Sequence, residues 1–177
     1  KKKLEGQEDV AHHISWGYTV GETTKMPQFW LIAASFIFIG FYVSGFALQF
    51  IPYFQSLEEK KILLISSATL ASMFGLFSIF GNILGGILFD KLGLSKSFLL
   101  AGTLVIIAGL CLLFVGKINA LGYLFTLLFG VSMFSYVMGP SYMTSSLFGD
   151  REYGAILGLI QLFFALGFAI GTPIFGV

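Results

Sequence analysis

The sequence predicts an all-α fold, a polytopic transmembrane helical bundle, on three observations. Apolar residues make up 56% of the 177 residues and charged residues only 11%, whereas a soluble domain carries roughly 25% charged residues. Phe occurs 21 times and Gly 22 times, as expected where bulky side chains face lipid and small ones let helices approach closely. The apolar residues also gather into long uninterrupted stretches. An ordinary soluble domain is therefore excluded.

Five of these stretches are long enough to cross a bilayer, which takes about 20 apolar residues. They are expected at about residues 29–54, 62–89, 97–115, 120–148 and 153–177. Helices are favoured over barrel strands because the stretches exceed the roughly 10 residues of a barrel strand and lack strict alternation. The first stretch follows Pro27, which suits a helix start. Since the connections are short, neighbouring helices are expected to run antiparallel.

Residues 1–28 are predicted to form a cytoplasmic loop that is partly disordered. The loop contains the adjacent pair His12 and His13, a pair that can bind metal, but no cysteine or regular acidic spacing accompanies it. We therefore predict no metal site and no cofactor. The chain starts without Met and stops at Val177 inside an apolar stretch, which leads us to expect a fragment of a longer protein.

The distribution of lysine and arginine predicts the orientation of the bundle. The side that holds residue 1 carries seven of these cations and the other side carries three. By the positive-inside rule, the residue 1 side is cytoplasmic, and the protein is expected to be a multi-pass protein of the plasma (inner) membrane. The lipid bilayer is thus one predicted partner. The net charge of +1 gives no indication of nucleic acid.

No Asp, Glu, Lys, Arg or His lies inside any of the five predicted spans. Ion pumps and proton relays usually place ionisable groups at membrane depth. An intramembrane enzyme needs an acid, a base or metal ligands. An enzymatic function is therefore disfavoured.

The connection after the second span carries the pattern Gly86-x-x-x-Asp90-x-x-Gly93. Gly86 allows close helix packing, and Gly93 permits a tight turn. Asp90 is suited to accept hydrogen bonds from a helix N-terminus, where the helix dipole favours an anion.

This pattern resembles the cytoplasmic signature of the major facilitator superfamily, in the form that is repeated between helices 8 and 9. Two further segments resemble the same superfamily in the right order. Residues 22–30 are similar to the entry into helix 7, and residues 148–173 are similar to helix 11. The resemblance implies half of a major facilitator fold, helices 7 to 11, with the N-terminal half and helix 12 absent from this chain.

Within the superfamily, residues 80–86 resemble the oxalate/formate antiporter and monocarboxylate porter branch. That branch carries an Arg four residues before the position of Gly86, where it engages the substrate carboxylate. Asn82 stands at that position here, and an amide has no net charge and no bidentate fork for a carboxylate.

The resemblance implies a secondary active transporter that carries a small organic solute by alternating access. A monocarboxylate or dicarboxylate is the first candidate substrate, and the uncharged spans leave neutral or apolar solutes open. The alternative is a non-transporting membrane receptor or assembly subunit that keeps the carrier-like fold.

The resemblance also implies which residues contact the substrate, because helices 7 and 10 of such carriers line the central cavity and helices 8 and 11 flank it. The residues implicated in this way are Tyr42, Gln49, Asn82, Ser132, Ser135, Tyr136 and Gln161. Amides and phenols in apolar surroundings need hydrogen-bond partners. Two plainer interpretations remain, since serines in membrane helices often bond their own backbone and a tyrosine can simply pack.

Two further roles concern conformational change. Asp90 and Arg151 are predicted to pair at cytoplasmic helix ends and, with Gly86 and Gly93, to latch the cytoplasmic side. Gly139-Pro140 in the fourth span predicts a kink, which acts either as a hinge during alternating access or as a static bend.

Overall fold

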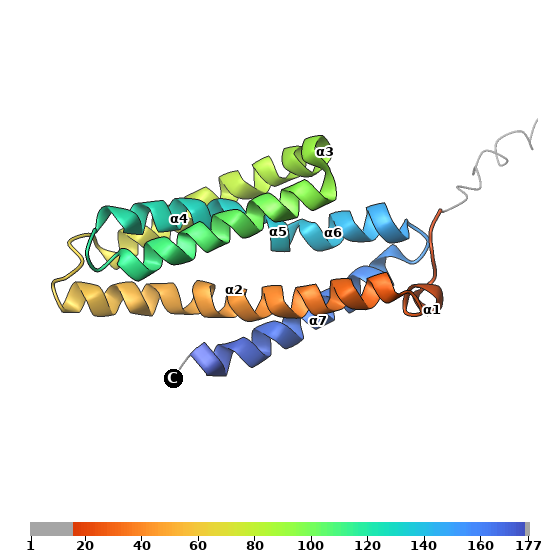
Figure 1. Ribbon diagram of the computed structural model, residues 1–177, viewed down its shortest axis with the longest axis horizontal. Helices are drawn as coiled ribbons and strands as arrows, with labels where there is room; N and C mark the ends of the chain where they lie inside the picture. Colours follow the sequence, from red (N-terminus) through yellow and green to blue (C-terminus); the bar gives the residue numbers. More distant parts are fainter. Residues whose placement is uncertain (1–15, 176–177) are drawn as a thin grey trace, which may run out of the picture.

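The computed structural model describes residues 16–175, and these residues confirm the predicted all-α fold. Within that range the chain forms helices and no strand, apart from one isolated bridge between Gly17 and Gly149. Figure 1 shows an elongated bundle whose helices run along its length. The His12 and His13 pair and Val177 lie outside the described residues.

The first helices are α1 (Val20–Thr23) and α2 (Pro27–Glu59). Pro27 stands in the first turn of α2, where its missing N–H leaves no hydrogen bond unmade. The helix continues through Pro52 and past residue 54, where the first span was predicted to end. Leu57 is buried, which explains why packing extends this last turn beyond the apolar stretch.

The long helix α3 (Ser67–Phe114) turns back on itself at Gly93, as Figure 1 shows. Gly93 has φ 75° and ψ 176°, a conformation that glycine adopts without the steric cost of a Cβ atom. The bend divides α3 into two arms, residues 67–92 and 94–114. The predicted connection at 90–96 is thus reduced to a turn centred on Gly93.

The fourth predicted span is a helix in four pieces rather than one regular helix. Its pieces are α4 (Ala120–Ser132), α5 (Phe134–Val137), α6 (Gly139–Met143) and the π-helix η1 (Thr144–Phe148). The last helix is α7 (Tyr153–Phe175). By length and composition, 4 helices among residues 16–175 are apolar enough to cross a membrane. The helix α3 is counted once among them although Gly93 divides it.

Two helix pairs form the frame of the bundle, since α2 packs along α7 and α3 packs along α4. Glycines let the backbones of the first pair meet. A Cβ atom on Gly40 would overlap the Phe164 carbonyl of α7, and one on Gly167 would overlap the Ile37 carbonyl of α2. This is the close approach that small residues provide in membrane helix pairs.

The two ends of the bundle are named here for what they contain. The α1 end holds α1 and the turn at residues 149–152, and the far end holds the connections at residues 60–66 and 115–119. A large buried cluster fills the far end, with Phe50, Phe54, Leu57, Leu63, Leu70, Ala108, Cys111, Val115, Phe125, Phe129 and Met133. A smaller one lies at the α1 end, with Phe29, Ile32, Phe36, Phe148, Ile156 and Ile160.

Candidate functional site

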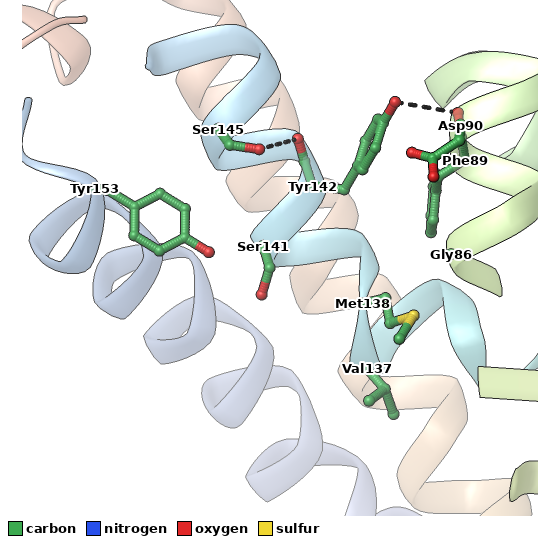
Figure 2. Close-up of a pocket in the computed structure, with 9 residues that line it drawn as sticks. All are labelled: Gly86, Phe89, Asp90, Val137, Met138, Ser141, Tyr142, Ser145 and Tyr153. Atoms are coloured by element: carbon green, nitrogen blue, oxygen red, sulfur yellow. Dashed lines mark hydrogen bonds between the residues drawn. The ribbon is translucent and has the colours of Figure 1, made fainter. Parts of the chain in front are cut away.

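A cavity of about 390 Å³ opens between the first arm of α3, the fourth span and the start of α7. We call it the Asp90 pocket. Figure 2 shows Tyr153 of α7 on one side, Phe89 and Asp90 of α3 on the other, and Ser141 and Tyr142 between them. Its full lining is Gly86, Phe89, Asp90, Val137, Met138, Ser141, Tyr142, Ser145 and Tyr153.

The polar groups of this pocket are four hydroxyls and one carboxylate. The Tyr142 hydroxyl donates to the Phe89 carbonyl at 3.1 Å, and the two rings stack with centroids 4.9 Å apart. The Ser145 hydroxyl donates to the Tyr142 carbonyl at 3.2 Å. Asp90 is the one carboxylate in the lining, which contains no Lys or Arg. Such a wall suits a group that donates hydrogen bonds better than it suits a free carboxylate.

A second set of polar side chains lies where α2, α5 and α7 meet. We call Tyr42, Ser135 and Tyr136 the Tyr42 cluster. The Tyr42 side chain lies beside the Ser135 side chain, and the Ser135 hydroxyl donates to the Ser132 carbonyl at 3.0 Å. Tyr136 stacks on Phe164 of α7, with ring centroids 5.6 Å apart and an interplanar angle of 3°. The structure thus brings the predicted residues Tyr42 and Tyr136 into one neighbourhood.

Ser132 bonds its own span in the same way as Ser135 does. Its hydroxyl donates to the Phe129 carbonyl of its own helix at 2.7 Å, and its side chain is fully buried. This is the self-bonding pattern of serines in membrane helices. The hydrogen bond therefore favours the structural interpretation of Ser132.

Asn82 lies in the first arm of α3, one helical turn from Gly86 on the same face. Its Oδ1 atom is enclosed by protein and has no hydrogen-bond partner among the described residues. A buried acceptor without a partner costs about 1–3 kcal/mol. Asn82 does not line the Asp90 pocket, so a donor to its amide would have to come from another part of the protein or from a ligand that displaces its neighbours.

The remaining two predicted amides lie elsewhere. Gln49 lines a separate cavity of about 270 Å³, together with Gly45, Phe46, Phe50, Tyr53, Leu112 and Phe175. Gln161 is exposed on α7. The predicted substrate residues are thus divided among several places on the described bundle.

The predicted pair of Asp90 and Arg151 is not formed in this structure, since no ion pair within 4.0 Å joins these two described residues. Arg151 lies instead in the turn before α7, where its charge acts on Glu22. Hydrogen bonds from the Thr19 backbone and side chain, and then Arg151, hold the pKa of Glu22 below its usual value. Gly86 and Asp90 line the Asp90 pocket, and the latch role itself stays a prediction.

Gly139 and Pro140 are buried at the junction of α5 and α6. Pro140 stands in the first turn of α6, and its carbonyl accepts the Thr144 hydroxyl at 2.7 Å. The helix is therefore interrupted at the predicted position, and its use as a hinge stays a prediction.

Sequence reasoning did not single out four side chains of the Asp90 pocket, namely Ser141, Tyr142, Ser145 and Tyr153. A signal for the first three existed. Ser145 follows Ser141 by four residues and Tyr142 by three in an apolar span, which places its side chain on the same helix face as theirs.

Comparisons with known proteins find similarity over most of the chain. A family model described as Major Facilitator Superfamily matches residues 2–172. Monocarboxylate transporter 12-B of Danio rerio is 28% identical over 154 residues, which is 85% of this chain and 32% of that protein. Monocarboxylate transporter 12 of Xenopus laevis is 28% identical over 156 residues, covering 85% of this chain and 33% of that protein.

A bacterial relative is similar over the same share of the chain. The uncharacterized MFS-type transporter YhjX of Escherichia coli (strain K12) is 26% identical over 159 residues, which is 85% of this chain and 37% of that protein. The chain thus spans about a third of the length of the curated relatives it matches. No solved structure matches it.

Proposed function

Because this chain belongs to the Major Facilitator Superfamily, we propose that it is part of a secondary active transporter that carries a small organic solute by alternating access. The relatives are longer than this chain, and we propose that the whole transporter likewise has an N-terminal half. That half would rock against this bundle around a substrate site near mid-membrane. In this arrangement the protein is an integral multi-pass membrane protein, and the α1 end faces the cytoplasm, as the distribution of Lys and Arg favours.

The proposed substrate is a small monocarboxylate or dicarboxylate. Two relatives are named monocarboxylate transporters, and this supports the class without fixing the compound. The described spans of this chain contribute amides and hydroxyls rather than cations, so we propose that the cationic partner of the carboxylate comes from the N-terminal half. The Tyr42 cluster and Asn82 would then hold the polar atoms of the substrate that do not carry the charge.

The observation that carries this proposal is the enclosed Oδ1 atom of Asn82. An amide acceptor without a partner in an apolar span is costly unless something donates to it. Asn82 also stands where the carboxylate-binding Arg of the resembled branch is found. A protonated carboxyl group or a substrate hydroxyl would supply the missing donor.

The test is the flux of labelled lactate, formate and oxalate into proteoliposomes that hold the full-length parent, with and without an imposed proton gradient. Uptake that follows the gradient, or exchange without it, is the expected result. No flux of any of the three would contradict the carboxylate proposal and direct the search to neutral or apolar solutes. Tight binding without flux of any solute would favour the receptor or assembly subunit instead.

The role of Asn82 is tested in the same vesicles with a matched pair of variants. Asn82→Ala removes the enclosed acceptor and is expected to lower the transport rate about tenfold, the effect of losing one buried hydrogen bond to substrate. The control is Ser72→Ala on the same helix, where an exposed hydroxyl donates to its own backbone at 2.9 Å. Equal rates for both variants would contradict a role of Asn82 in binding.

A further inference from the structure

The segment before α2 is hydrogen-bonded to the turn before α7, although the two lie about 130 positions apart in the sequence. The Tyr18 N–H donates to the Phe148 carbonyl at 2.9 Å, and the Asp150 N–H donates to the Trp16 carbonyl at 2.7 Å. These bonds flank the isolated antiparallel bridge between Gly17 and Gly149. Residues 16–22 therefore form a strap across the α1 end of the bundle.

Three consecutive backbone donors of the strap have acceptors. After Tyr18, the Thr19 N–H donates to the Glu22 carboxylate at 2.8 Å within a capping box. The Val20 N–H donates to the Glu152 carboxylate at 2.6 Å. Hydrogen bonds to a charged acceptor are shorter and stronger than neutral ones, so Glu152 makes the strongest single contact between the strap and α7.

The contact requires glycine on both sides. Gly17 has φ 146° and Gly149 has φ 77°, which L side chains rarely adopt. A Cβ atom on Gly17 would lie 2.6 Å from the Phe148 carbonyl oxygen, and one on Gly149 would overlap the Trp16 carbonyl. The backbones at Gly17 and Gly149 therefore approach so closely that a side chain at either position would disrupt the contact.

The residues that follow the strap contact α2, so the strap and its continuation join both members of a helix pair. The Trp30 indole N–H of α2 donates to the Thr24 carbonyl at 2.9 Å, directly after α1. Glu152, at the other side of the strap, is followed at once by Tyr153, which begins α7 and lines the Asp90 pocket. The strap thereby sets where α7 starts relative to α2 and to the pocket wall.

We propose that residues 16–22 form a strap that fixes the start of α7, with Glu152 as its positioning residue. The effect of the strap on transport rests on the proposed transport function, whereas the strap itself does not. In a carrier whose halves rock, the chain that enters this bundle would pull on α2 and α7 together rather than on α2 alone. Glu152 does not contact the substrate; it acts through Val20 and Tyr153.

The existence of the strap is tested by amide hydrogen exchange of the peptide 16–24 in the full-length parent, which needs no transport. Gly17→Val is expected to speed exchange of these amides about tenfold, as loss of the hydrogen bonds lowers the local opening free energy. The control is Gly21→Val in α1, where a Cβ atom meets nothing within 4 Å. Equal exchange in Gly17→Val and the wild type would overturn the strap.

The positioning role is tested by transport kinetics. Glu152→Ala is expected to lower the maximal rate several-fold while KM changes less than about twofold, the pattern of a residue that does not bind substrate in the ground state. Glu152→Gln keeps an acceptor oxygen and is expected to restore most of the rate. A maximal rate that stays at the wild-type value in Glu152→Ala, despite faster exchange, would overturn the positioning role and leave the transport function intact.

Discussion

The far end and the α1 end of the bundle are packed in different ways. At the far end, eleven buried residues form one cluster in which Phe50, Phe54, Phe125 and Phe129 contact one another. At the α1 end, the buried clusters are smaller. Two cavities of about 390 and 330 Å³ lie beside them, whereas a smaller cavity of about 270 Å³ borders the far-end cluster at Phe50.

The helices are also more regular at the far end than at the α1 end. Through the far end α2 stays regular, even across Pro52, and α4 is continuous. Towards the α1 end the same span breaks into α5, α6 and the π-helix η1. Interrupted helices and π-turns are frequent at functional positions. The comparison predicts that the far end keeps its shape and that any change of shape occurs at the α1 end.

The largest expected effect comes from removing an aromatic ring at each end. Phe125 is fully buried and contacts Phe50 at 5.7 Å and Phe129 at 5.5 Å between ring centroids. Phe125→Ala is expected to lower the free energy of unfolding by about 3–5 kcal/mol. Phe98→Ala, at the half-buried wall of a cavity, is expected to cost about 1 kcal/mol.

The measurement is the midpoint of unfolding in a mixed detergent series, read by helical circular dichroism. Equal losses for Phe125→Ala and Phe98→Ala would contradict the difference in packing between the two ends.

The sequence was informative where one physical property dominates a segment. Long apolar stretches predict membrane helices because an unpaired backbone group is costly in lipid, and Gly93 predicts a turn because its conformation excludes a Cβ atom. The pattern also identified Gly86 and Asp90 of the pocket. The π-helix at residues 144–148 had no such signal, since no residue type is specific to the wider turn.

Two features of the α1 end were beyond sequence reasoning for a common reason. The hydroxyls of Ser141, Tyr142 and Ser145 look alike in a sequence whether they bond their own backbone or line a cavity. The strap is joined to the turn before α7 largely by backbone groups, and the side-chain bond in this contact joins residues 132 positions apart. Only the assembled fold brings Glu152 to Val20, so neither local propensity nor periodicity contains the information.

A second, smaller effect tests whether the break at Gly139-Pro140 works as a hinge. Pro140→Ala restores a backbone donor and removes the ring that hinders a regular helix. The variant is expected to change the free energy of unfolding by less than about 1 kcal/mol, since the restored donor is offset by the greater freedom of the unfolded chain. It is expected to lower the transport rate several-fold, because the span resists bending. The transport rate is measured in proteoliposomes, and stability in the detergent series above.

Pro52→Ala in α2 is the matched control for the far end, since that helix is already continuous there. It is expected to leave the transport rate unchanged. A rate that falls equally in both variants would show that prolines affect the bundle in general, whereas an unchanged rate in Pro140→Ala would mean that the break is a static bend.

The smallest expected effect is a pH dependence of the strap through Glu22. Hydrogen bonds from Thr19, and then the charge of Arg151, lower the pKa of Glu22 from its usual 4.5. A carboxyl group with a depressed pKa stabilises the folded arrangement fully above its unfolded pKa, and this contribution is lost as the pH falls through the lower, folded value. Strap protection is thus expected to be constant above pH 4.5 and to decline below it.

The effect is small because Glu22 is fully exposed and its attraction to Arg151 is screened by solvent. The measurement is amide exchange of the peptide 16–24, normalised at each pH to the free peptide of the same sequence. Glu22→Gln cannot ionise and is expected to give a flat profile. Raising the salt concentration separates the two causes, since it weakens the attraction of Arg151 but not the Thr19 hydrogen bonds. Identical pH profiles for Glu22→Gln and the wild type would place the acid sensitivity of the α1 end elsewhere, with Glu152 as the next carboxylate to replace.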